Sequence, residues 1–149
     1  GQEKRIRIIP QMVRAVVTKK KDLGVINGVL EREEIEYDVD FQLGLKTFLD
    51  CPTFIHKLRH FAPFHDFTFE IDKYINLQMP LVTAEVEMKK EEIDTFNSLK
   101  LRSWIDEDWS LVKEYSNYNL LKKVDSSLGI PYYVKNMLVD KAGSSLRMK

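Results

Sequence analysis

Charged side chains alternate with apolar ones in several short segments of this 149-residue chain. One isoleucine separates Arg5 from Arg7, and one leucine separates Lys57 from Arg59. The same spacing recurs among acidic residues, at Glu34 and Glu36, Glu70 and Asp72, and Glu85 and Glu87. Because successive side chains of a β-strand point to opposite faces, both members of each pair project from one face. The pattern predicts sheets with one apolar face and one densely charged face.

A densely charged sheet face has two interpretations. It is an ordinary solvated surface, since antiparallel sheets often bury one face and expose the other. Alternatively, it lines a barrel that holds a polyanion together with its metal ions. The solvated surface is the simpler interpretation of any single pair, whereas the recurrence of such groups along the chain favours the barrel. Residue spacing alone does not decide between the two.

The order of the predicted elements constrains the fold class. Strands are expected at residues 5–9, 13–19, 33–39, 54–60, 67–74 and 81–88. Residues 20–27 are expected to form a loop that ends with the turn-forming pair Asn-Gly. Helical segments are expected at residues 41–49, 91–96, 120–124 and 132–141, with Asp40 as the cap of the first and Pro131 at the start of the last.

Most of these helices follow the strands instead of alternating with them. That order predicts an α+β fold with a mostly antiparallel sheet, and not a parallel doubly wound one. Strands that carry charge on one face are able to close into a barrel or half-barrel. The length fits one domain over residues 1–149, with helices at its periphery.

The composition argues against a disordered chain, a nucleic-acid-binding protein and a membrane-spanning protein. Apolar residues make up 44% of the chain and charged residues 31%, a balance typical of globular proteins. The 23 basic and 23 acidic residues cancel, so no overall positive field attracts DNA or RNA, and neither is expected as a partner. Cys51 is the single cysteine, which fits a reducing compartment. The chain has no signal-peptide-like start and no apolar run of membrane-spanning length, so we expect a cytoplasmic protein without a membrane partner.

Mixed charges on neighbouring strands suit a site for a phosphate compound and a metal ion. A triphosphate needs basic donors on more than one side, with arginine giving forked contacts and lysine a point charge. Carboxylates such as Glu85 and Glu87 are the hard oxygen ligands that Mg²⁺ or Mn²⁺ prefers. Basic and acidic side chains largely compensate one another until ligand and metal arrive.

Taken in order, these segments resemble the CYTH family, also called the triphosphate tunnel metalloenzymes. Arg5 with Arg7 resembles its Arg-x-Arg strand, residues 16–19 its Leu-Thr-Ile-Lys strand, residues 32–37 its Arg-x-Glu-x-Glu-Tyr strand, and Lys57 with Arg59 its Lys-x-Arg strand. Residues 70–72 resemble its Glu-Ile-Asp strand, residues 81–87 its Gly-Leu-x-x-Ala-Glu-x-Glu strand, and Trp104 and residues 115–120 its C-terminal Trp and Tyr-Ser-Asn-x-x-Leu segment. The resemblance covers about residues 5–123, and residues 125–149 extend beyond it.

The resemblance implies a β-tunnel that binds triphosphate compounds with Mg²⁺ or Mn²⁺. It assigns phosphate binding to the basic residues Arg5, Arg7, Lys19, Lys57 and Arg59. It places Glu85 and Glu87 at the metal, with Glu34, Glu36, Glu70 and Asp72 as supporting acidic residues. The expected function is binding and hydrolysis of triphosphate compounds, with inorganic triphosphate as the default substrate. The alternatives are a class IV-type adenylate cyclase and a non-catalytic module that binds a nucleotide or polyphosphate.

One departure from the family leaves catalysis open. The family begins with a Glu-x-Glu-x-Lys strand that is central to metal binding, and no such motif precedes Arg5. Either the missing strands lie upstream of these residues, or the chain is a shortened relative. A different register would place Glu3, Arg5 and Arg7 on that first strand, with arginine in place of a carboxylate. No catalytic residue is assigned, and the oligomeric state is left open.

Overall fold

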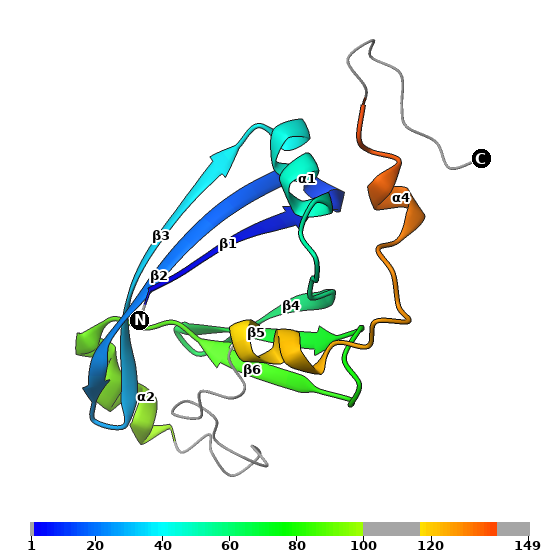
Figure 1. Ribbon diagram of the computed structural model, residues 1–149. Coiled ribbons are helices and arrows are strands. Elements are labelled where there is room, and N and C mark those ends of the chain that lie inside the picture. The colour runs from blue at the N-terminus through cyan, green and yellow to red at the C-terminus, as the bar shows by residue number, and fades with distance from the viewer. Residues whose placement is uncertain (1, 100–116, 140–149) are drawn as a thin grey trace. The chain divides into compact units, whose positions relative to one another are not determined.

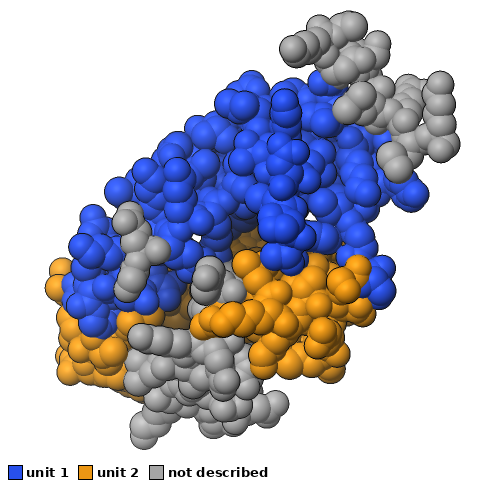
Figure 2. Space-filling model, in the orientation of Figure 1, with its two compact units in different colours: residues 1–24, 31–54, 127–149 blue, residues 25–30, 55–126 orange. Residues whose placement is uncertain are grey.

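The computed structural model describes residues 2–99 and 117–139. The chain falls into two compact units (Figure 2). Unit 1 consists of Gly1–Gly24, Glu31–Phe54 and Ser127–Lys149, and unit 2 of Val25–Leu30 and Ile55–Ser126. Within the described ranges, strand pairing gives two antiparallel three-stranded sheets, with the orders β1-β2-β3 and β4-β5-β6, and does not close a barrel. The predicted α+β class with antiparallel sheets is therefore confirmed.

Unit 1 is built on the first sheet. Its elements are β1 (Gln2–Ile9), the 3-10 helix η1 (Pro10–Met12), β2 (Arg14–Ile26), β3 (Val29–Val39), α1 (Phe41–Leu49) and α4 (Tyr132–Lys135), the tip of the β2–β3 hairpin being counted with unit 2. The helix α1 lies on one face of this sheet (Figure 1). The side chains of Ile6, Ala15 and Val39 lie there next to Gly44 of the helix. Ala15 and Leu45 are fully buried there.

The β2–β3 hairpin is longer than the sequence indicated. The loop expected at residues 20–27 is wrong, because β2 continues through Ile26 and only Asn27 and Gly28 form the turn. Both turn residues have positive φ, 50° and 77°, as the type I′ hairpin turn requires. The polar run that resembled a loop forms instead the exposed outer part of a paired strand.

The helix α1 begins and ends where the sequence predicts. The Asp40 carboxylate accepts a hydrogen bond of 3.0 Å from the Leu43 backbone N–H and so caps the first turn. The Gln42 side chain ties the C-terminal segment to this helix, since it donates to the Met137 carbonyl and accepts from the Val139 N–H. The predicted last helix is shorter than expected, because α4 ends at Lys135, and residues 140 and 141 of that prediction lie outside the described residues.

Gly44 is the point of closest approach between α1 and the sheet. A Cβ added at Gly44 would overlap the Ala15 side chain and press on Val39. We expect Gly44→Val to lower the free energy of unfolding by about 2–3 kcal/mol, the upper range for overpacking a core. Lys46→Val, on the exposed side of the same helix, is the control, and only its loss of helix propensity, at most about 0.7 kcal/mol, should register. Equal urea midpoints for the two variants would contradict this packing.

Unit 2 is built on the second sheet. Its elements are β4 (Lys57–Phe64), β5 (Phe67–Tyr74), β6 (Val82–Val86), η2 (Lys90–Glu92), α2 (Ile93–Ser98), α3 (Asn117–Leu120) and η5 (Leu121–Lys123). On one face Phe96 of α2 packs against Phe67 and Phe69 of β5, with ring centroids 5.3 and 6.1 Å apart. Leu120 joins Tyr74, Leu77 and Leu81 in a buried cluster.

Backbone hydrogen bonds hold the end of η5 and the residues after it against the rest of unit 2. The Gln78 N–H donates to the Lys123 carbonyl, and the Asp125 N–H donates to the Asn76 carbonyl, each at 2.8 Å. The buried Asn76 side chain accepts from the His56 N–H and so fixes the entry to β4. The strand predicted at residues 54–60 is shifted, because β4 starts at Lys57 and extends to Phe64. Pro63 is compatible with β4 because this strand lies at an edge of the sheet.

No helix within residues 2–99 and 117–139 has both the length and the apolar character needed to cross a membrane.

Candidate functional site

The charged face of the β4–β6 sheet brings together basic and acidic residues from all three of its strands. Register places Arg59 opposite Asp72, and Asp72 opposite Thr83. One step along the strands, Phe61 lies opposite Glu70, and Glu70 lies opposite Glu85. Directly paired residues point to the same side of a sheet. Lys57, Arg59, Glu70, Asp72 and Glu85 therefore share one face, which we call the unit 2 charged face.

Asp72 is the buried centre of this face. Its carboxylate accepts two hydrogen bonds from Arg59, at 2.7 Å from Nε and 2.8 Å from Nη2. Lys57 Nζ lies 2.8 Å from the same carboxylate, and only 1% of the Asp72 side chain is exposed. A bidentate arginine contact and a lysine contact together satisfy the buried charge. Asp72 thereby fixes the positions of both basic side chains.

The charges of Asp72 and Arg59 do not change over the physiological pH range. Burial alone would raise the pKa of the Asp72 carboxyl, but the hydrogen bonds from Arg59 and Lys57 outweigh it and lower that pKa to about 2. The hydrogen bond to Asp72 raises the pKa of Arg59, with Glu70 and Glu85 adding to the effect. Burial raises the pKa of Tyr74 to about 12. Asp72 stays anionic and Arg59 cationic, so neither is suited to exchange protons near neutral pH.

Arg59 also connects the buried centre to the carboxylates further along the face. Its Nη1 lies 3.1 Å from Glu70 Oε2. Glu70 and Glu85 are directly opposite one another, and like charges in that position destabilise a sheet unless a cation lies nearby. The face carries the cations Lys57 and Arg59 and the anions Glu70, Asp72 and Glu85, a formal charge of 2 − 3 = −1.

Glu87 comes directly after the last residue of β6. The strand β6 ends at Val86, so strand alternation no longer fixes the side to which the next side chain points. Among residues 2–99 and 117–139, no set of three or more His, Cys, Asp or Glu side chains is arranged as a ready-made metal cluster.

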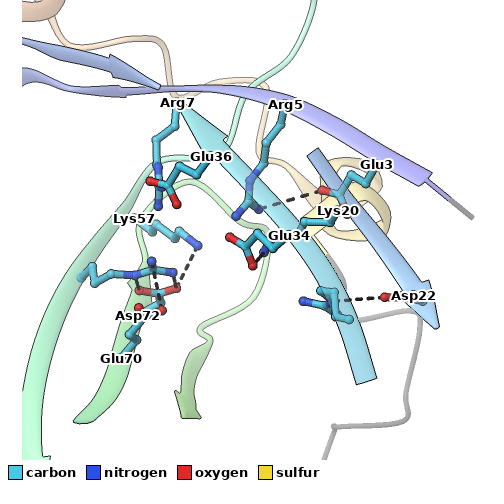
Figure 3. A network of polar contacts seen from close by, with 12 residues as sticks. Glu3, Arg5, Arg7, Lys20, Asp22, Glu34, Glu36, Lys57, Glu70 and Asp72 are labelled. Carbon is cyan, nitrogen blue, oxygen red and sulfur yellow. Dashed lines mark hydrogen bonds and ion pairs between the residues drawn. The ribbon is translucent and has the colours of Figure 1, made fainter. Parts of the chain in front are cut away.

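The β1–β3 sheet carries a second charged face, in which the charges are paired. Arg7 bonds Glu36 at 2.9 Å, and Lys20 lies 3.9 Å from Glu34 (Figure 3). Further pairs are Arg5–Glu3, Arg14–Asp38 and Arg32–Asp22. The predicted residues Arg5, Arg7, Glu34 and Glu36 thus lie on one face of unit 1.

Lys19 does not share that face. Register pairs Arg5 with Thr18 and Lys4 with Lys19, so Lys19 points to the opposite side of the sheet. There its ammonium lies 5.9 Å from the ring centroid of Tyr37. The expectation that Lys19 converges with Arg5 and Arg7 is wrong, and the lysine on their face is Lys20, which pairs with Glu3 in the register. A run of three lysines gives no sequence signal for which one turns inward.

Phe61 is the residue of the unit 2 charged face that sequence reasoning missed. A spacing of two residues from Arg59 is the signal that places Phe61 on this face, as the register shows. Its side chain is 66% exposed, although the other aromatic residue on this face, Tyr74, is buried. Of the C-terminal segment in the family resemblance, Trp104 and residues 115 and 116 lie outside the described residues.

Comparison with known proteins adds no relative. No family model, curated protein or solved structure matches this chain.

Proposed function

We propose that the unit 2 charged face binds triphosphate compounds together with Mg²⁺ or Mn²⁺, and that the chain hydrolyses the bound triphosphate. The observation that carries this proposal is the position of Arg59, whose Nε and Nη2 are held by Asp72 while Nη1 lies beside Glu70. Arginine has five N–H donors, and these contacts use three of them. As far as the contacts with described residues go, one donor on each terminal nitrogen is left for a phosphate oxygen.

The charge balance explains why a metal ion belongs to the proposal. With a formal charge of −1, the face alone repels a polyanion. Binding of one divalent cation beside Glu70 and Glu85 changes that charge to −1 + 2 = +1 and relieves the repulsion between the two carboxylates. Mg²⁺ is commonly held by one or two carboxylates, with phosphate oxygens and water completing its shell. Glu70 and Glu85 fit that donor set, with Glu87 as a further candidate.

The metal ion and the side chains of this face have distinct roles in the proposal. The metal ion, when bound, polarises phosphate oxygens. Arg59 supplies forked donors to the triphosphate, and Lys57 supplies a compact positive charge. Asp72 keeps both basic side chains in place and does not itself exchange a proton. The proposal assigns no general base.

The family resemblance extends this proposal to a tunnel. In that form, Arg5 and Arg7 also bind phosphate, from the charged face of unit 1. The ion pairs there are partly exposed and therefore weak, so a triphosphate is able to displace the carboxylates from the arginines. The tunnel form requires that Arg5→Ala weaken triphosphate binding.

The hydrolytic part is tested by phosphate release from tripolyphosphate with and without Mn²⁺. We expect Glu85→Gln, which keeps the shape of the side chain but removes its charge, to lower metal-dependent turnover at least tenfold, since each metal-ligand carboxylate contributes directly to affinity. Glu91→Gln, an exposed carboxylate in η2, is the matched control and should behave as the unchanged chain does. Equal turnover in Glu85→Gln and in the unchanged chain would remove Glu85 from the site.

A non-catalytic binding module is the second candidate. It is favoured by the absence of a preformed cluster of three metal-ligating side chains among the residues that the structure describes. Tight, metal-independent binding of tripolyphosphate without phosphate release would establish this candidate in place of the hydrolase.

A further inference from the structure

The strand β3 is an exposed edge of the unit 1 sheet. Within residues 2–99 and 117–139 it pairs with β2 alone, so its other backbone edge has no strand partner there (Figure 1). Every residue from Arg32 to Asp38 is exposed, so both faces of this stretch are in contact with solvent. An edge strand presents a row of backbone N–H and C=O groups with which an added strand can pair.

Of the four edge strands in the two sheets, β3 offers the most backbone for such pairing. It has 11 residues and no proline. By contrast, β6 has only five residues, and β4 contains Pro63, which has no N–H to donate. The remaining edge strand, β1, has eight residues. Short length and proline are common protections of sheet edges, and β3 has neither.

The two faces of β3 differ in chemistry. Glu34, Glu36 and Asp38 each make an ion pair with a basic residue of the same sheet, yet their side chains stay 31%, 42% and 63% exposed. A carboxylate has two acceptor oxygens and therefore has room for a further donor. Ile35 and Tyr37 alternate with these carboxylates and point to the other face, where they are 54% and 41% exposed.

These two faces specify the chemistry of a strand that would add to β3. Side chains of directly paired residues share a face. The added strand therefore needs basic residues at every second position, opposite the carboxylates, and apolar residues between them, opposite Ile35 and Tyr37. With five carboxylates and one arginine, β3 has a formal charge of 1 − 5 = −4. That charge attracts a basic strand and repels the β3 strand of a second copy.

We propose that β3 binds an extended basic peptide as an additional strand of the unit 1 sheet, with basic and apolar side chains alternating along the peptide. Backbone hydrogen bonds supply affinity in this mode of recognition, and the alternating side chains supply specificity. The interaction goes beyond triphosphate binding and does not depend on it, since the unit 2 charged face takes no part.

The probe is the acetylated, fluorescently labelled heptapeptide Lys-Val-Lys-Val-Lys-Val-Lys, titrated with the unchanged chain and followed by anisotropy. Two derivatives are methylated on the backbone nitrogens of all valines or of all lysines. Alternate N–H groups of a strand point to opposite edges, so only one of these sets faces β3. We expect one derivative to bind at least about tenfold more weakly than the other, because it loses up to about three backbone hydrogen bonds. Equal affinities would show binding by charge alone and overturn the proposal.

Ile35→Lys places a positive charge on the apolar face of β3 and should weaken binding of the unmethylated probe at least about fivefold. Val82→Lys is the matched control, because it makes a similar change at a 62% exposed position of the edge strand β6 in unit 2. It should leave the affinity within about twofold. An equal loss of affinity in the two variants would contradict binding at β3.

Amide hydrogen exchange of the unchanged chain locates the peptide without any substitution. Alternate amides between residues 32 and 38 should gain protection when the probe binds, because only every second N–H faces the open edge. Protection confined to other strands, or failure of the chain to bind the probe, would overturn the proposal. Protection of these amides that grows with protein concentration in the absence of peptide would identify a second copy as the occupant, and would also overturn it.

Discussion

Asp72→Ala is expected to lower the free energy of unfolding at pH 7 by about 3–5 kcal/mol, the range for breaking a buried ion pair by removing one partner. The side chain is 1% exposed and is contacted by two cations, Lys57 and Arg59. Without the Asp72 carboxylate, the two positive charges lie next to each other in a partly buried site, and no anion there compensates them. Urea denaturation followed by circular dichroism measures the effect. Lys73→Ala, at the next and exposed position of β5, is the control and should change stability by less than about 0.5 kcal/mol.

The pH dependence of stability is a second test of the contribution of Asp72. The pKa of Asp72 in the folded chain, about 2, lies below its usual value of 3.8, so the unfolded chain binds more protons between these values. Stability therefore rises with pH through this window, and the contribution of about 2 kcal/mol that is complete above pH 4 is lost as the pH falls toward 2. Asp72→Asn should flatten that part of the profile. If Asp72→Asn lost stability between pH 4 and pH 2 as steeply as the unchanged chain, Asp72 would not be the group responsible.

Arg59→Ala is expected to weaken triphosphate binding by about 1.5–3 kcal/mol, which is roughly ten- to a hundredfold in Kd, the range for lost hydrogen bonds to a charged group. Arg59→Lys keeps the positive charge but loses the fork, so it should recover only part of the affinity. Lys73→Ala removes a positive charge from the opposite face of the same sheet and should bind as the unchanged chain does. Titration calorimetry with tripolyphosphate and Mg²⁺ compares the three variants, and equal affinity in Arg59→Ala would exclude this arginine from the site.

Local sequence signals predicted the elements that depend on local chemistry. Asp40 caps α1 as expected because an N-cap needs only its own carboxylate and an N–H three residues on. The strand Phe67–Tyr74 has the predicted bounds, since its alternation matches the two faces of the sheet. The same alternation correctly placed Arg59 on the same side of its strand as Lys57, and Asp72 on the same side of its strand as Glu70.

Features that depend on a partner strand could not be predicted in this way. The face taken by Lys19 is set by the pairing of Arg5 with Thr18, and the triple-lysine run contains no information about that register. The outer part of β2 was mistaken for a loop because its polar residues have the composition of a turn, whereas their pairing in a long hairpin makes them a strand. Apolar residues on a charged face, such as Phe61, escape a search for charges alone.

The most direct test of triphosphate binding at the unit 2 charged face is a titration of the ¹⁵N-labelled chain with tripolyphosphate and Mg²⁺, followed by NMR. The largest changes in amide shift are predicted on the three strands at Lys57, Arg59, Glu70, Asp72 and Glu85, with Arg59 showing an additional change at its side-chain Nε–H. The tunnel form predicts further changes at Arg5 and Arg7. Saturable shifts confined to other surfaces, or the absence of any saturable shift, would contradict the proposed site.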